Sequence, residues 1–220
     1  MRTETILNTL TNTLKNNPVL NNDRVFINLI NELKAEVYSD SMDKSSKRSF
    51  MQRQKAALSF LKKQTKQIRK IFAYSDIQTI DDTEYQVFTD SYMAFYLKEK
   101  MSLPTMGDYH ANGDKGDFPS MERLFPYDRE AIDFNVKEHL ASLKSKTCHY
   151  MENGTPACLF CDSDKYVIDL NKVKTAYQIL GDNLQASKTN TKHPMLVLKN
   201  ENGLALIMSI YNKDGIKFAK

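Results

Sequence analysis

Hydrophobic and polar positions change their spacing along this chain, and the changes predict a helical start followed by a mixed body. Apolar residues recur at helical spacing over 6–14 and again over 26–37, which predicts two N-terminal helices. Residues 39–46 are polar and predict a loop. Over 50–72 the apolar residues return to one side of a helix. Beyond Phe72 the period shortens to that of β-strands.

Three short β-rich runs follow at 77–80, 85–88 and 92–97, separated by polar turn residues. Residues 104–117 hold a proline, three glycines and few apolar side chains, which predicts an exposed connection. We therefore expect three parts: an N-terminal helical segment over 1–40, a first domain over 41–127 that includes this connection, and a second domain over 128–220.

The second domain contains a repeated pattern. Ala131-Ile-Asp-Phe-Asn135 and Val167-Ile-Asp-Leu-Asn171 lie 36 residues apart, and each leads from a strand into a helix. In both copies the asparagine is placed to cap that helix. Further strands follow at 148–151 and 157–160 in the first copy, and at 195–198 and 204–211 in the second. The pattern predicts an internal β-α-β-β duplication and, with the helices before it, an α+β fold.

Charge is distributed unevenly along the chain. The 27 residues from Lys44 to Lys70 hold ten cations and no acid, so the rest of a chain whose net charge is +4 carries −6. Such a segment favours binding to a polyanion, although a solvated helix face or an acidic partner would also accommodate it. A cationic helix of this kind can follow phosphates without reading bases.

Other features limit the class of protein. No apolar run reaches the roughly 20 residues that cross a bilayer, and the polar N-terminus is not typical of a signal peptide. Three cysteines, an odd number, fit a reducing compartment, so we expect a cytoplasmic protein without a membrane partner. Phosphate-loop, zinc-protease and serine-nucleophile motifs are missing, which predicts a protein that is not an enzyme and that needs no cofactor.

Three stretches give the chain a family resemblance. Thr89-Asp-Ser-Tyr-Met-Ala94 resembles Thr-Asp-Gly-His-Arg-Leu-Ala of DNA sliding clamps of the bacterial type, with Ser91 at the glycine. The stretch 116–126 is similar to the Gly-x-Phe-Pro linker of these clamps, and Leu206-Ile-Met-Ser-Ile210 is similar to their C-terminal strand, with Ser209 at the proline. The resemblance implies repeated β-α-β-β-β half-domains, to which this chain adds the N-terminal helical segment.

The resemblance also implies a function. A clamp is a processivity factor in DNA replication: it encircles or tracks duplex DNA without sequence specificity and tethers a polymerase. The chain has room for about two reduced domains, so we expect a homo-oligomer in the form of a homotrimeric ring, with a monomeric clamp relative as the alternative. A phage could encode such a protein. The implied apolar groove for polymerase peptides comprises Thr89, Tyr92, Met93, Pro119, Arg123, Leu124, Met208 and Ile210.

The expected DNA contacts come from cations on the predicted helices. The first group lies on the cation-rich helix, and the second lies on the helices of the repeat. In order, these candidates are Lys55, Lys62, Lys63, Lys66 and Arg69, followed by Lys137, Lys144, Lys172 and Lys174.

Two alternative functions remain open at this point. The first is a clamp-fold interaction protein that competes for clamp partners and keeps the groove without closing a ring. The second is a zinc-containing nucleic-acid-binding module whose tetrahedral ligands are Cys148, His149, Cys158 and Cys161. Adjacent residues of a strand point to opposite faces, which counts against the pairing of Cys148 with His149 as ligands. Three buried thiols are the simpler explanation for the cysteines.

Overall fold

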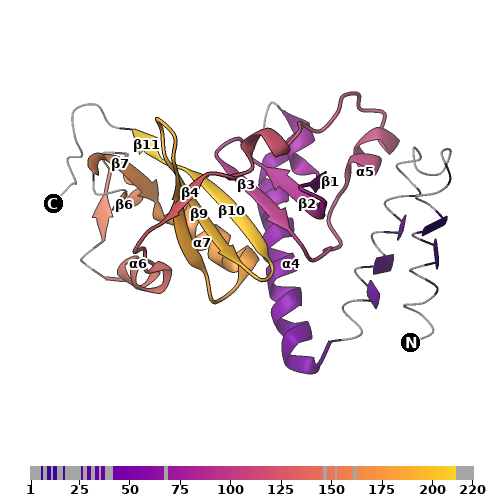
Figure 1. Cartoon of the computed structure of the whole chain (residues 1–220), viewed down its shortest axis with the longest axis horizontal. Coiled ribbons are helices and arrows are strands. Elements are labelled where there is room, and N and C mark those ends of the chain that lie inside the picture. Colours follow the sequence, from indigo (N-terminus) through magenta and orange to yellow (C-terminus); the bar gives the residue numbers. More distant parts are fainter. Residues whose placement is uncertain are drawn as a thin grey trace. The chain divides into compact units, whose positions relative to one another are not determined.

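The computed structural model describes residues 42–66, 69–145, 148–151, 153–160 and 163–211, with isolated positions between 6 and 37. The two helices expected before residue 40 lie outside the continuously described residues. The described part contains four α-helices and two antiparallel sheets, which confirms an α+β fold (Figure 1). It divides into two compact units: unit 1, with 1–88 and 97–121, and unit 2, with 89–96 and 122–220. No helix in these stretches is long and apolar enough to cross a membrane.

Unit 1 begins its described part with α4 (Lys44–Gln64). The carboxylate of Asp43 caps this helix, because it accepts hydrogen bonds from the backbone N–H groups of Ser45 (2.8 Å) and Ser46 (3.0 Å). The loop expected up to residue 46 is therefore helical from residue 44 onward. One face of α4 is buried and consists of Phe50, Arg53, Ala57, Phe60, Leu61 and Gln64.

Strands β1 (Asp76–Ile80) and β2 (Thr83–Thr89) form an antiparallel hairpin in unit 1. Asp81 and Asp82 make its two-residue turn with φ angles of 51° and 56°, a left-handed backbone that short polar side chains tolerate. The ring of Phe88 in β2 lies 5.7 Å from that of Phe60 in α4, so the helix packs on this hairpin. The predicted strands at 77–80 and 85–88 are confirmed.

The prediction for 104–117 is wrong in part. A short helix, α5 (Met106–Ala111), begins there with a capping box between Thr105 and Asp108, and it buries Met106 and Tyr109. Helix α4 ends at Gln64, and Lys70, the last cation of the basic segment, lies in the 3₁₀ turn η1 (Lys70–Ala73). The basic segment is therefore not one continuous helix up to Phe72.

Unit 2 holds two antiparallel sheets. Five strands of the larger sheet lie in the order β3-β10-β9-β8-β4, and the smaller sheet has the order β11-β7-β6-β5. The larger set comprises β3 (Met93–Leu97), β4 (Arg129–Ala131), β8 (Gln185–Thr189), β9 (Met195–Asn200) and β10 (Gly203–Met208). The smaller sheet comprises β5 (His149–Tyr150), β6 (Pro156–Phe160), β7 (Ser163–Asp169) and β11 (Ile210–Tyr211).

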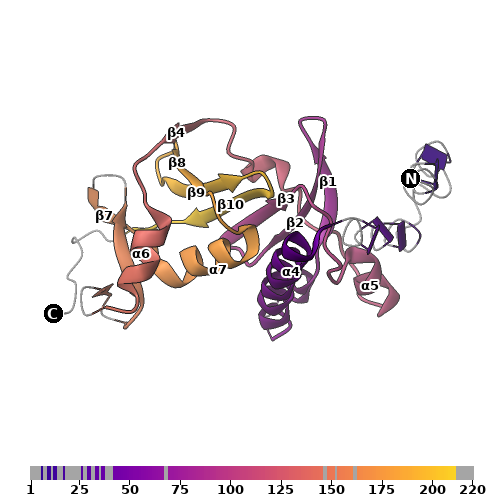
Figure 2. The same cartoon turned by 90° about the horizontal axis from the view of Figure 1, so that it is seen from below.

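Helices α6 (Val136–Ser142) and α7 (Leu170–Leu180) lie on one side of the larger sheet of unit 2 (Figure 2). The stripe of α7 that faces the sheet is fully buried and comprises Leu170, Val173, Ala176, Ile179 and Leu180. In chain order, a strand, a helix and two strands occur twice, as β4-α6-β5-β6 and β7-α7-β8-β9.

The two helices of unit 2 are capped by different residue types. Asn135 caps α6, since its side chain accepts from the N–H of Glu138. The second expected cap, Asn171, is wrong. Helix α7 begins two residues earlier than that cap requires, and the carboxylate of Asp169 accepts from the N–H of Asn171 at 2.8 Å.

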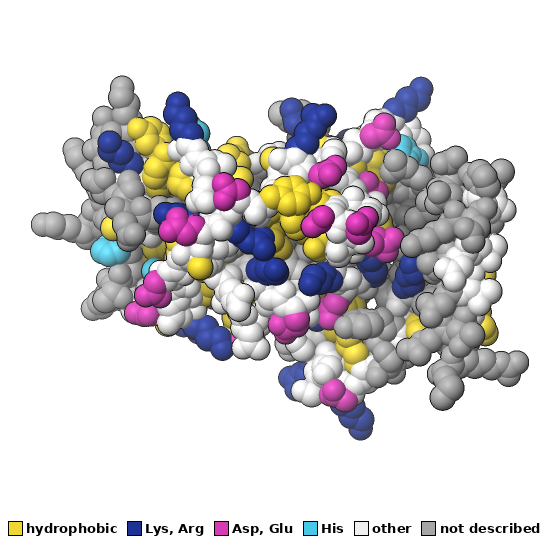
Figure 3. Space-filling model, viewed as in Figure 1, with side chains coloured by type: hydrophobic (Ala, Val, Ile, Leu, Met, Phe, Trp, Pro, Cys, Tyr) yellow, Lys and Arg dark blue, Asp and Glu magenta, His cyan; other side chains and the backbone are white. Residues whose placement is uncertain are grey.

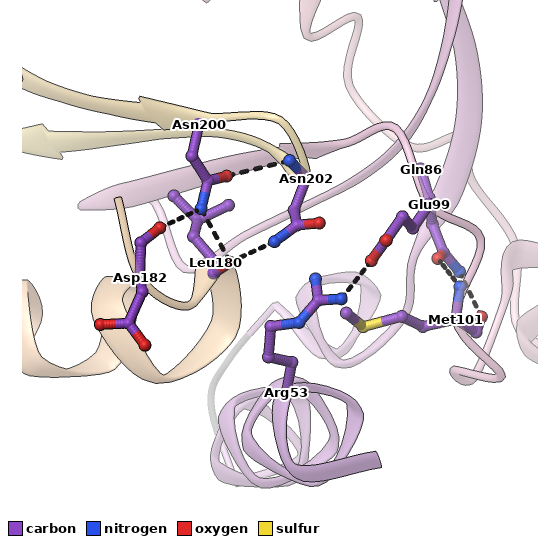
Figure 4. Close-up of polar contacts among 8 residues, drawn as sticks. All are labelled: Arg53, Gln86, Glu99, Met101, Leu180, Asp182, Asn200 and Asn202. Atoms are coloured by element: carbon purple, nitrogen blue, oxygen red, sulfur yellow. Dashed lines mark hydrogen bonds and ion pairs between the residues drawn. The ribbon is translucent and has the colours of Figure 1, made fainter. Parts of the chain in front are cut away.

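A network of amide side chains fixes the end of α7 against the β9–β10 hairpin (Figure 4). The buried side chain of Asn200 donates to the carbonyls of Leu180 (3.0 Å) and Asp182 (2.8 Å), and Asn202 donates to the same Leu180 carbonyl at 2.7 Å. These bonds satisfy carbonyls that a helix end leaves without an internal partner. The turn expected between residues 200 and 203 is confirmed.

Candidate nucleic-acid interface

The outer face of α4 carries a line of cations. At 100° per residue, Lys44, Arg48, Lys55 and Lys62 fall within about 40° of one another, opposite the buried face of the helix. We call these four residues the cationic stripe; it extends for about 27 Å along the helix. All four side chains are exposed, and Lys66, exposed as well, follows one turn beyond Lys62.

The cations of the first predicted group are all on the surface. Lys55, Lys62, Lys63, Lys66 and Arg69 are exposed, and none forms an ion pair with another described residue. Helix α4 itself contains no acid. In contrast, cationic and acidic side chains are interspersed among the coloured residues on the face in Figure 3. Within α4 the exposed charges are therefore all of one sign, and their fields add along the cationic stripe.

Arg53 is the exception within α4. The sequence analysis counted it among the cations of the basic segment, but it lies on the buried face and is 6% exposed. It forms an ion pair with Glu99 at 2.5 Å (Figure 4), and its guanidinium lies 5.8 Å from the ring of Phe50. Glu99 follows β3 in the chain, so the acid that compensates this cation comes from outside the basic segment.

Two members of the second predicted group have partners in unit 2. Lys137 forms an exposed ion pair with Asp182 at 2.8 Å, and this hydrogen bond raises the pKa of Lys137 and lowers that of Asp182. The ammonium of Lys172 lies 4.6 Å from the ring centre of Tyr92. Lys144 and Lys174 are exposed. The lysines on α6 and α7 therefore leave fewer cations available for a phosphate backbone than α4 does.

The first and last groove stretches meet in unit 2. The backbone N–H of Met208 donates to the carbonyl of Tyr92 at 2.9 Å, and both side chains are exposed, by 44% and 59%. Leu124, in the 3₁₀ turn η2 (Glu122–Leu124), is 49% exposed. The next residue in the linker, Phe125, packs edge-on against Tyr96 of β3 with ring centres 5.2 Å apart. The linker therefore lies against the strand that follows Tyr92.

The turn before β3 explains one departure from the clamp pattern. Ser91, which stands at the position of the glycine in the clamp motif that the sequence analysis compared, has a φ of 76°. Glycine adopts this left-handed backbone most readily. Asp90 holds the turn, because its carboxylate accepts from the N–H groups of Tyr92 (2.8 Å) and Met93 (2.7 Å). Ser91 therefore keeps the backbone conformation that a glycine at this position would favour.

The remaining groove candidates are placed differently from one another. Thr89 and Met93 are buried, and the Thr89 hydroxyl donates to the Met93 carbonyl at 2.6 Å, so both stabilise the turn. Arg123 is exposed and Ile210 is half-buried. Pro119 belongs to unit 1, where its carbonyl accepts from Gln78 at 3.0 Å. The exposed apolar part of the groove in unit 2 consequently reduces to Tyr92, Leu124 and Met208.

The structure describes three of the four candidate zinc ligands, and they differ in exposure. Cys148 and Cys158 are buried, whereas His149 is exposed, and Cys161 lies outside the described residues. Among residues that the structure describes, no group of three or more His, Cys, Asp or Glu side chains is placed to hold a metal ion. The described part of this cluster therefore consists of two buried thiols, Cys148 and Cys158, and one exposed histidine.

Sequence reasoning missed Lys44 and Arg48 as members of the site. The predicted loop over 39–46 placed Lys44 outside the helix, and without it the line of four cations was incomplete. The signal was nevertheless present. Asp43 before two serines is an N-terminal cap, and a helix that begins there brings both cations onto the line of Lys55 and Lys62.

Comparisons with protein-family models, with curated proteins and with solved structures found no match to this chain.

Proposed function

We propose that this protein holds double-stranded DNA electrostatically and without sequence specificity, as a processivity factor similar to a sliding clamp. The observation that carries the proposal is the cationic stripe: four exposed cations in line on a helix whose opposite face is buried and which contains no acid. Cations placed along a phosphate backbone release condensed counterions, and this supplies affinity for any sequence.

The groove supports the second half of the proposal, the tethering of a polymerase. Tyr92, Leu124 and Met208 are large apolar side chains that stay exposed, and a hydrogen bond joins two of the segments that carry them. Methionine and aromatic side chains adapt to different apolar anchors of a short peptide. A peptide with two or three such anchors is the ligand that this surface would take.

The DNA half is tested with two variants of equal charge change. In the first, Lys55, Lys62 and Lys66 become glutamate; in the control, the exposed lysines Lys98, Lys115 and Lys192 do. At about 0.1 M salt, loss of three phosphate contacts weakens binding to a labelled duplex by roughly 10²- to 10³-fold. The control should bind within a few-fold of the unmodified protein. Equal losses in both variants would show that only total charge matters and would refute the role of α4.

The clamp half is tested by topology. A closed ring stays on circular duplex DNA at high salt and leaves it after the circle is cut, because residence then depends on linkage and not on contact strength. Light scattering of the same sample gives the oligomeric state. A monomer that leaves both DNA forms equally but still binds polymerase-derived peptides would favour the competitor of clamp partners. Retention that is independent of topology would contradict the ring.

A further inference from the structure

The hairpin of β5 and β6 places two thiols opposite each other. The register pairs His149 with Ala157 and Tyr150 with Pro156. Continued by one residue, the same antiparallel register brings Cys148 opposite Cys158. The turn at the far end of the hairpin contains Gly154, whose φ is 79°.

The hydrogen bonds of this hairpin show which kind of pair the cysteines form. At the turn, the N–H of Met151 donates to the carbonyl of Thr155 at 2.9 Å, so this pair is hydrogen-bonded. Bonded and non-bonded pairs alternate along an antiparallel ladder. Three steps further, Cys148 and Cys158 therefore form a non-hydrogen-bonded pair. In agreement, the N–H of Cys148 donates to the carbonyl of Ser145 and not to the opposite strand.

This kind of pair has the spacing that a disulfide needs. Opposite Cα atoms in non-hydrogen-bonded pairs lie about 4.5 Å apart, within the roughly 4.4–6.8 Å found for disulfides. Opposite residues also project their side chains to the same face of the sheet. Both cysteines are buried, at 8% and 7% exposure, and both are free thiols.

The environments of the two thiols differ. Burial, and then the charge of Cys148, raise the pKa of Cys158 to about 12, which suppresses its thiolate. The two side chains are almost equally buried, and the Cys148 thiol donates to the carbonyl of His149 at 3.6 Å. Because burial suppresses the Cys158 thiolate, Cys148 makes the first attack on an oxidant and Cys158 completes the reaction.

We propose that Cys148 and Cys158 are a redox modification site that forms a reversible disulfide across the β5–β6 hairpin. With a small disulfide such as oxidised glutathione, the Cys148 thiolate attacks one sulfur and releases one glutathione thiolate. Cys158 then loses its proton and attacks the Cys148 sulfur, which releases the second glutathione. The two thiols are oxidised by two electrons, and one glutathione disulfide is reduced to two glutathiones. Strand β5 is only two residues long, and the disulfide would fix it against β6.

The test uses the full chain with Cys161→Ser, which leaves only the two cysteines in question. After equilibration with oxidised glutathione, intact mass should fall by two hydrogen atoms, both thiols should resist alkylation in denaturant, and a dithiol reductant should restore them. The link closes a short loop and should raise the melting temperature by roughly 5–10 °C. Cys148→Ser in the same background is the control and should show none of these changes.

Two results would overturn the proposal. One is a stable glutathione adduct on Cys148 beside a Cys158 that still alkylates in denaturant, since the second attack would then fail. The other is one equivalent of zinc in the purified protein that is lost in the Cys148→Ser variant, since the thiols would then be ligands. Neither result affects DNA binding by α4, so this inference and the proposed function fail independently.

Discussion

Removal of one partner of the buried ion pair of Arg53 and Glu99 should cost unit 1 a large part of its stability. The two side chains are 8% and 14% exposed, so the pair belongs to the buried class and not to the surface class worth less than about 1 kcal/mol. Glu99→Ala leaves a buried guanidinium without its counter-charge. Among the described residues, Nε and Nη1 of Arg53 have no hydrogen-bond partner, so without Glu99 the guanidinium keeps its contact with the Phe50 ring but loses its counter-charge. We expect a loss of about 3–5 kcal/mol in the free energy of unfolding.

A double-mutant cycle separates this charge effect from lost packing. The cycle consists of Glu99→Met, Arg53→Met and the two together, with Glu99→Ala measured beside it, and urea unfolding is followed by circular dichroism. Apolar replacement of both partners of a buried pair is often neutral, so the double variant should lie within about 1 kcal/mol of the unmodified protein. Glu99→Ala should melt roughly 6–20 °C lower. A Glu99→Ala variant as stable as the unmodified protein, or a double variant that only adds the single losses, refutes the reasoning.

Three further predictions concern other residues. Burial lowers the pKa of Lys100 to about 8 despite its ion pair with Glu84, so the unfolded chain holds this proton more tightly. The free energy of unfolding should therefore rise as the pH increases from about 8 to 10.5. Lys100→Met removes the cost of the buried charge, so it should flatten this rise and add about 1–3 kcal/mol to the free energy of unfolding at pH 7. Urea unfolding midpoints measure both effects. Ser91→Gly should stabilise the protein by about 0.5–1 kcal/mol because φ is 76°, and a loss of stability would contradict the assigned backbone. Tyr92→Ala with Met208→Ala should weaken a polymerase-derived peptide at least tenfold by calorimetry and leave DNA affinity unchanged; a parallel loss of both would contradict separate sites.

Local chemistry explains which elements could be predicted from the sequence. Turns with clear signals were placed well: Asp81-Asp82 and the asparagine-rich stretch at 200–203 separate paired strands as expected. The strand-to-helix transition of the second repeat copy was also expected, and the buried residues of α7 recur at every third position from Leu170 to Ile179. At these positions, residues that are close together in the sequence determine the local secondary structure.

The misplaced residues depend on contacts distant in the chain. Helical spacing from Phe50 and Ala57 places Arg53 on the buried face, but its counter-charge, Glu99, comes 46 positions later and cannot be found in the local sequence. Helix α5 was missed because Gly107 and the polar residues around it are typical of a loop, although Thr105 and Asp108 form a capping box. Asp169 and not Asn171 caps α7, although both residue types are good caps, and the earlier start buries Leu170 at the first helical position.

The most direct test of the account is the salt dependence of duplex binding. The logarithm of the binding constant falls with the logarithm of salt concentration, with a slope of about −0.9 for each phosphate neutralised. Replacement of Lys55, Lys62 and Lys66 by glutamate should reduce the steepness of this slope by about 2.7, whereas the same change at Lys98, Lys115 and Lys192 should leave it unaltered. A slope that stays the same in the first variant would contradict DNA binding by the outer face of α4.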